Sequence, residues 1–259
     1  MESVPTLITV PARADSAEEL EPILQTLVSL RSTAPDAMVL VIDDRSPAPF
    51  AAMIEAAASE LDCAHVVQQD GEGRYAAYNV GLAAAAQYDM NAVLVDSGLV
   101  FDQARWLDRL LARTGTDGAA AAIAGGAVVE PTGLIRQAGY FFSLFRRDWG
   151  ARLARAPQQL LDDHQPLLCP VSAELMLVRR EWIERAGAFD ELIDDVAHGS
   201  LDFCLRVSDA GGQCVLEPSV RARALVLGEG EPDPKSAAAG RLRIKQAGVN
   251  FQPWAPEVV

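Results

Sequence analysis

The chain has 259 residues, half of them apolar, which is enough to bury a large core in a single domain. Its 22 lysine and arginine residues stand against 36 aspartate and glutamate residues, so the net charge is −14. This acidity disfavours binding to the phosphate backbone of nucleic acid, and we expect no nucleic-acid partner.

The sequence predicts neither a membrane-spanning nor a secreted protein. The first residues lack the basic start of a secretion signal, and the longest uncharged apolar run, Gly118–Val129, is too short to cross a bilayer. The four cysteines lack the spacing of a zinc site or of a disulfide framework. We therefore expect reduced thiols and a cytoplasmic location.

The first half of the chain alternates short apolar runs with amphipathic helical stretches, a pattern that predicts a parallel sheet with crossover helices. Strands are expected at residues 6–11, 37–42, 65–68 and 91–95. Helices are expected after the capping residues Asp15 and Ser16, and at residues 50–61, 74–87 and 103–113.

The second half has a less regular pattern. It predicts strands at residues 119–129, 171–178 and 213–217, and helices at residues 180–185 and 200–210. Residues 140–166 collect aromatic side chains and arginines without a clear period, which favours a loop over a cleft. We expect one domain over residues 1–227, made of a half at 1–115 and a half at 116–227, with residues 228–259 as a tail.

Polar residues follow two of the predicted strands, where open parallel sheets bind ligands. Asp43, Asp44 and Ser46 come after the second strand, and a carboxylate there can accept a hydrogen bond from a base or a ribose. Asp96 comes after the fourth strand and can bind a divalent cation with help from substrate phosphates. The competing interpretation for these residues is structural: they cap helices and make turns.

The stretch Gly73–Gly81 opens a predicted helix with small residues, which lets a ligand approach the helix start. Arg74 can meet a diphosphate there. Taken alone, the stretch also fits a packed Ala-rich helix with an exposed arginine.

An acidic stretch in the second half offers several candidates for a general base, because such a base must only reach the acceptor hydroxyl. The candidates are Asp190, Glu191, Asp194, Asp195 and Asp202. For each of them alone, a solvated surface carboxylate is the competing interpretation, and a single nearby histidine, His198, is a weak sign of a site.

Taken together, the order of these pieces resembles the family 2 glycosyltransferases. The matching segments of the first half are the strand ending in Pro11, Val41–Ser46, Gly73–Gly81 and Val95–Gly98. Those of the second half are Gly133–Gly139, Leu175–Arg180, Gly187–Glu191 and Asp202–Arg206. They cover roughly residues 5 to 225, and their shared order is more specific than any single motif.

The resemblance implies a GT-A fold, a Rossmann-like α/β domain with a mostly parallel central sheet flanked by helices. It implies a nucleotide-diphosphate sugar across the strand ends, a divalent cation (Mn²⁺ or Mg²⁺) held by an Asp-x-Asp motif, and transfer with inversion to a glycan or other acceptor. The nucleotide-binding residues would be Pro11, Arg13, Asp43, Asp44, Ser46, Arg74, Asn79 and Asp96, with Asp96 also the metal ligand.

The chain departs from the family pattern at the positions that matter most for chemistry. Gly98 stands where the second Asp of the metal motif belongs, and a glycine cannot coordinate a metal through a side chain. In the region of the catalytic base, Gly199 and Ser200 replace the expected Glu-Asp pair. A histidine that often follows the last strand is absent as well, and Arg221 to Leu225 occupy that region.

Two hypotheses follow from these departures. In the first, the protein is an active transferase, with Asp202 or Asp195 as the base and with Asp96 or an arginine meeting the diphosphate. In the second, it is an inactive relative that binds a nucleotide, a glycan or a protein. A nucleotidyltransferase is disfavoured, because Pro11–Asp15 does not resemble a glycine- and lysine-rich phosphate loop.

Overall fold

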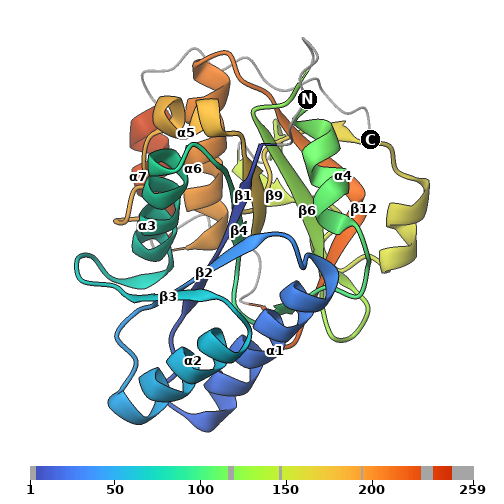
Figure 1. The fold of residues 1–259 in the computed structure, drawn as a ribbon. Helices are drawn as coiled ribbons and strands as arrows, with labels where there is room; N and C mark the ends of the chain where they lie inside the picture. Colours follow the sequence, from blue (N-terminus) through green and yellow to red (C-terminus); the bar gives the residue numbers. More distant parts are fainter. Residues whose placement is uncertain (1–3, 116–119, 146–147, 194, 229–235, 247–259) are drawn as a thin grey trace.

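The computed structural model describes residues 4–115, 120–145, 148–193, 195–228 and 236–246 (Figure 1). The helices are α1 (Ala17–Thr33), α2 (Ala48–Glu60), α3 (Gly73–Gln87), α4 (Trp106–Arg113), α5 (Arg180–Ala186), α6 (Val196–Asp209) and α7 (Ala237–Gln246), with a 3-10 helix, η1, at Gln158–Asp163. The strands are β1 (Thr6–Ala12), β2 (Met38–Asp43), β3 (Ala64–Val67), β4 (Asn91–Val95), β5 (Leu99–Val100), β6 (Ile123–Val129), β7 (Ile135–Gln137), β8 (Tyr140–Ser143), β9 (Asp148–Ala151), β10 (Leu167–Leu168), β11 (Leu175–Val178) and β12 (Cys214–Ala224).

The larger sheet has the strand order β10-β12-β6-β11-β4-β1-β2-β3, with β5 beside β12 and β7 beside β6. Strands β3, β2, β1 and β4 are parallel to one another, and β6 is parallel to β12. Strand β11 runs antiparallel between β4 and β6. The predicted α/β class, with a mostly parallel central sheet flanked by helices, is confirmed.

An apolar core lies on each face of this sheet. Strand β1 is buried along its whole length, as expected of a strand that is covered on both sides. Tyr78 and Phe203 belong to the core beneath α3, α5 and α6, which Figure 1 shows gathered on one side of the sheet. Leu27, Ile54 and Leu110 bring α1, α2 and α4 onto the other core. The apolar faces of the amphipathic helices therefore pack against the sheet.

The second half differs from its predicted strand boundaries. Strand β12 runs on to Ala224, because it passes Pro218 through a register shift between Leu216 and Arg221. Strand β11 begins only at Leu175, since Ser172 makes local hydrogen bonds to Glu174 in place of sheet pairing.

The loop predicted at residues 140–166 contains regular structure. Strands β8 and β9 form a hairpin in which Phe142 faces Trp149 across the strands, with ring centroids 5.4 Å apart. The aromatic residues without a clear period thus pair across a short hairpin, which a search for long periodic segments does not detect.

The region predicted as a tail also contributes to the packing. Helix α7 contacts α6, and Leu242 joins an apolar cluster with Leu201, Leu205, Tyr140 and Trp149. Within the described ranges, every helix is too short or too polar to cross a membrane.

Candidate functional site

The carboxyl ends of β1, β2 and β4 form the edge at which the predicted site residues meet. Asp43 is the last residue of β2, Asp44 follows it, and Asp96 follows β4. All three side chains are buried. Because these strands are adjacent and parallel, the three carboxylates lie along one edge of the sheet, where α/β proteins bind ligands.

The two residues predicted from β1 differ in exposure. Pro11 is buried within the strand and lies opposite Ile42 of β2. Arg13 follows the strand and is half exposed, and its guanidinium donates to Asp15 at 3.1 Å and to the carbonyl of Asp44 at 3.5 Å. Arg13 therefore stands beside the carboxylate edge and keeps part of its surface open to solvent.

Asp43 has one satisfied and one unsatisfied oxygen. Its Oδ1 accepts from the backbone N–H of Ser46 at 2.9 Å, and the Ser46 hydroxyl accepts from Ala14 N–H at 3.1 Å. Asp43 Oδ1 and Ser46 therefore make a turn, as the structural interpretation of these residues expects. The Oδ2 atom is buried and has no partner among the described residues.

Gln68 adds an unpartnered amide that the sequence did not single out. It follows β3 directly, and its backbone N–H donates to the carbonyl of Asp43 at 2.9 Å. Its side chain is buried, and neither the amide nitrogen nor the amide oxygen has a partner within the described part of the chain. Leaving such groups unsatisfied costs about 1–3 kcal/mol each, which makes the ends of β2 and β3 a candidate position for a ligand.

Asp44 ties the loop after β2 to the start of α3. Its Oδ2 accepts from the Gly73 N–H at 2.8 Å, while Arg45 lies 3.5 Å from Oδ1. Gly73 has φ of +81°, which favours glycine at this turn. Glu72, the N-cap residue of α3, makes no capping hydrogen bond through its side chain. The Asp44 side chain therefore caps the start of α3 in place of Glu72.

Arg74 and Asp96 form the ion pair at the centre of this edge. The Arg74 Nε donates to Asp96 Oδ1 at 2.9 Å. Burial lowers the pKa of Arg74, but Asp96 and other nearby groups outweigh it and raise the pKa above its usual value. The guanidinium is therefore charged at any physiological pH, and it occupies one oxygen of the predicted metal ligand.

The geometry around Asp96 does not fit a divalent cation. Gly98 has no side chain to offer, and its φ of +86° is a conformation that other residues rarely adopt. Its N–H donates to Thr26 Oγ1 at 2.9 Å, which fixes this turn. Among the described residues, no three His, Cys, Asp or Glu side chains are grouped to hold a metal ion. A single carboxylate that is already paired with Arg74 is a poor site.

A second charged cluster lies beside this pair and was not predicted. Arg136 donates to Glu130 at 2.7 Å and to Glu174 at 2.8 Å, and the Glu174 carbonyl accepts from Asp96 N–H at 2.9 Å. Burial raises the pKa of Glu174, although Arg136 opposes the shift. The available signal was a glutamate inside an apolar run before Leu175, where a core position would be apolar.

Gly199 and Ser200, the two positions of α6 where the family pattern places the catalytic base, are buried. Ser200 is fully buried, and its hydroxyl accepts from Ala173 N–H at 2.8 Å and donates to the carbonyl of Val196. A Cβ on Gly199 would lie 2.3 Å from Cζ of Tyr75, so the tyrosine ring fills the space beside this glycine. Even a small side chain would have to move that ring.

The two proposed bases have different surroundings. Asp202 is buried, and its oxygens lie 3.1 Å from Arg206 Nε and 3.0 Å from Lys245 Nζ. Asp195 caps α6 by accepting from His198 N–H at 2.8 Å and also contacts the His198 ring, and its side chain is 28% exposed. Burial raises the pKa of Asp195, but the hydrogen bonds from His198 outweigh it, so the pKa is lowered.

The remaining predicted positions have structural contacts or are not described. Asn79 accepts from Phe189 N–H at 2.7 Å and donates to the Phe189 carbonyl and to Glu191, so its amide fastens α3 to the loop before α6. Its polar atoms are thus already engaged. Asp194 lies outside the described residues.

Comparison with known proteins gives the family. The model of glycosyl transferase family 2 matches residues 10–185, which is more than half of the chain. The chain belongs to this family. No curated protein sequence matches it. The family match covers the carboxylate edge and the cluster around Glu174, but ends before α6.

Two solved structures show the same fold. GalNAc-T7, in a crystal structure with UDP, GalNAc and Mn²⁺, is 15% identical with a TM-score of 0.64, and the alignment covers 92% of this chain and 47% of that one. The mannosyltransferase PcManGT from Pyrobaculum calidifontis, in complex with GDP-Man and Mn²⁺, is 16% identical with a TM-score of 0.55, covering 88% and 59%. The predicted GT-A fold is confirmed, and the chain spans about half of the length of these structures.

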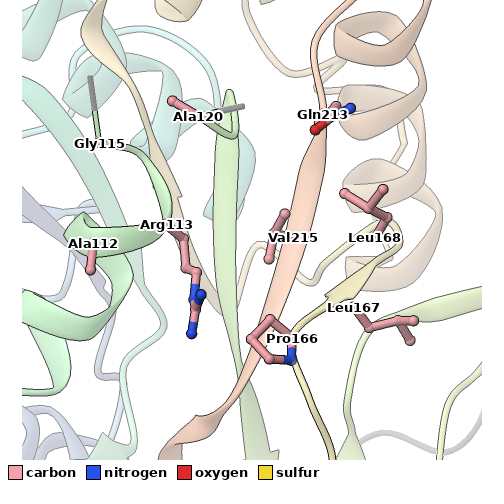
Figure 2. A pocket seen from close by; sticks show the side chains of 9 residues that line it. All are labelled: Ala112, Arg113, Gly115, Ala120, Pro166, Leu167, Leu168, Gln213 and Val215. Carbon is pink, nitrogen blue, oxygen red and sulfur yellow. The ribbon is translucent and has the colours of Figure 1, made fainter. Parts of the chain in front are cut away.

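A pocket of about 290 Å³ lies elsewhere in the molecule (Figure 2). Its lining includes Arg113 at the end of α4, Leu168 of β10 and Val215 of β12. It borders the starts of β6 and β12, and β6 has the same direction as β4, so this pocket is at the opposite edge of the sheet from Asp96. None of the predicted site residues lines it.

Proposed function

We propose that this protein binds a nucleotide-diphosphate sugar at the carboxyl ends of β1, β2 and β4 and transfers the sugar, with inversion, to a glycan or other acceptor. The observation that carries the proposal is the pair of buried, unpartnered groups at this edge, Asp43 Oδ2 and the Gln68 amide. Membership in the transferase family, and neighbours whose structures contain UDP or GDP-Man, support the same class of ligand.

A nucleobase can satisfy these groups. The Asp43 oxygen accepts hydrogen bonds only, while the Gln68 amide both donates and accepts. Uracil and guanine each present a ring N–H beside a carbonyl, so one edge of the base offers a donor and an acceptor together. The binding of such a base would remove the cost of the unsatisfied groups.

For the chemical step we propose Asp195 as the general base. Asp195 is partly exposed, and the Tyr75 hydroxyl, next to Arg74 in sequence, donates to its carbonyl at 3.1 Å. In this step the acceptor oxygen bonds to the anomeric carbon, the bond from that carbon to the phosphate oxygen breaks, and the diphosphate leaves with the electron pair. The hydroxyl proton passes to Asp195. Because a lowered pKa makes a weak base, proton transfer must accompany bond formation.

The binding part of the proposal is tested by calorimetric titration of UDP and GDP. Asp43→Asn keeps the Oδ1 contact with Ser46 but replaces the unpartnered acceptor by a donor, and Gln68→Ala removes the amide. Each is expected to weaken the preferred nucleotide at least tenfold, while Asp89→Asn, an exposed change elsewhere, leaves binding unchanged. Wild-type affinity in both site variants would refute the assignment of these residues.

A second candidate is a non-catalytic domain that binds the nucleotide sugar without transferring it. The specific observation in its favour is the closed base region, where Tyr75 fills the space beside Gly199 and Ser200 is fully buried. The two candidates separate in one assay: release of UDP or GDP from a panel of nucleotide sugars supports the transferase, and binding without release supports the second candidate.

The proposal includes a cytoplasmic location. All four cysteines are buried thiols, which supports a reducing compartment.

A further inference from the structure

We infer that Arg74 takes the place of the divalent cation in this protein, so that the diphosphate of the nucleotide binds without a metal. This inference rests on the proposed function, because it concerns the same ligand at the same strand ends. It departs from the two structural neighbours, whose structures contain Mn²⁺ together with UDP or GDP-Man.

Arg74 lies against the carboxylate that the metal motif would use. It is the second residue of α3, and its Nε lies 2.9 Å from Asp96 Oδ1. That carboxylate is the oxygen donor that the metal motif retains in this chain. A cation seated on this oxygen would have to displace the guanidinium, whose charge is stabilised by Asp96.

The charges of Asp96 and Arg74 can be compared with those of a complete metal motif. An Asp-x-Asp pair holding a divalent cation carries two negative and two positive charges, which sum to zero. In this chain, Gly98 removes one negative charge and Arg74 provides one positive charge against Asp96. The charges of Asp96 and Arg74 again sum to zero, so this pair by itself carries the same net charge as the metal-loaded motif.

Arg74 also has hydrogen-bond donors that no described residue uses. Within the described residues, its hydrogen bond to Asp96 uses Nε, and neither terminal nitrogen makes a further hydrogen bond. Its side chain is 36% exposed. A planar guanidinium that is anchored by Nε can present both terminal nitrogens to phosphate oxygens.

The surroundings fit a phosphate group as well. Arg74 belongs to the first turn of α3, a helix of 15 residues whose first N–H, that of Gly73, already donates to Asp44, so a phosphate would meet the guanidinium rather than this N–H. The unpartnered Asp43 oxygen and Gln68 amide lie at the same end of the neighbouring strands. The base and the diphosphate of one nucleotide would thus meet groups along a single edge of the sheet.

The test is a calorimetric titration of UDP and GDP in EDTA and, separately, in Mn²⁺. The wild type is expected to bind its preferred nucleotide equally well, within threefold, in both buffers. Arg74→Ala should weaken binding at least tenfold in EDTA, and Mn²⁺ should not restore it. Arg74→Lys should bind with intermediate affinity, because lysine keeps the charge but loses the planar fork. Arg109→Ala, an exposed arginine on α4, is the matched control.

The outcomes separate this inference from the proposed function. Binding that requires Mn²⁺, or unchanged affinity in Arg74→Ala with a native thermal melt, overturns the inference alone. No binding by the wild type in either buffer overturns the proposed function and the inference together. Metal-independent binding that is lost in Arg74→Ala and partly kept in Arg74→Lys supports both.

Discussion

The two halves of this protein differ in how their buried carboxylates are paired. At the strand ends of the first half, a buried oxygen of Asp43 has no partner among the described residues. In the second half, Glu174 is held by Arg136, Asp190 by Arg241 and Lys245, and Asp202 by Arg206 and Lys245. Within the described residues, the first half keeps a buried carboxylate oxygen without a partner, whereas Glu174, Asp190 and Asp202 of the second half are each paired with at least one cation.

This difference separates the binding of a nucleotide from the chemical step. An unpartnered buried group can gain a hydrogen bond when a ligand binds, while a carboxylate between two cations gains little by binding anything else. Nucleotide recognition is therefore the better supported activity. The proposed chemical step assigns the base to Asp195, a carboxylate that is partly exposed and held by a histidine rather than by a lysine or an arginine.

The largest expected effect is the loss of turnover in Asp195→Asn. Removing a general base lowers the rate by about 10²–10⁴-fold, and nucleotide affinity should be unchanged because Asp195 is not among the nucleotide-binding groups. Asp209→Asn, an exposed carboxylate at the end of the same helix, is the control. Nucleotide release measured at saturating sugar nucleotide decides the matter, and full activity in Asp195→Asn would contradict the assignment.

The next effect concerns the closed base region. Gly199→Ala places a Cβ 2.3 Å from the Tyr75 ring, and we expect a loss of about 1–3 kcal/mol in the free energy of unfolding. Gly240→Ala, in α7, meets no atom within 4 Å and should not destabilise the protein. Urea unfolding measures both variants. If Gly199→Ala is as stable as the wild type, Tyr75 moves freely and the base region is open.

Much of the fold follows from local sequence patterns. The periodic helices and continuous apolar strands of the first half are found close to their predicted places, because burial on both faces leaves a strong signal. Helix α6 begins at Val196 rather than at 200, since Asp195 caps it and Gly199 is accommodated inside it. The β8–β9 hairpin and α7 were missed, because their stability comes from packing between distant segments.

The site was predictable in part for the same reason. A carboxylate after a buried strand marks the edge of a sheet, so Asp43, Asp44 and Asp96 could be placed together. The same pattern does not predict which cation pairs with each carboxylate. The ion pair of Arg74 with Asp96 joins α3 to the end of β4, and the contact of Lys245 with Asp202 joins residues 43 positions apart. Only the folded chain shows which carboxylates are already neutralised.

The smallest effect is expected for the ion pairs that Asp190 makes with Arg241 and Lys245. Burial raises the pKa of Asp190, but Arg241 and Lys245 outweigh it and lower the pKa. The pairs therefore stabilise α7 above the unfolded-state pKa of about 3.9, and this contribution is lost as the pH falls through the lower pKa of the folded state. Both cations are partly exposed, so each pair contributes only about 0.2–1 kcal/mol.

Hydrogen exchange of the α7 amides measures this contribution. Raising the salt concentration to about 1 M should increase their exchange by about two- to fivefold, because salt screens partly exposed ion pairs. The buried amides of α3 serve as the internal control and should not respond. Exchange of α7 that is independent of salt would show that Leu242 and its apolar contacts hold the helix without help from the ion pairs.

Metal-free binding of a nucleotide at the carboxyl ends of β1, β2 and β4 is tested most directly by backbone amide NMR. UDP and GDP are titrated in EDTA into the labelled protein. Binding at these strand ends should shift the amide signals of residues 43–46 and 68–76 and leave those of α7 and of the pocket beside Arg113 unchanged. Shifts confined to that pocket or to residues 120–227, or no shifts until Mn²⁺ is added, would contradict metal-free binding at the strand ends.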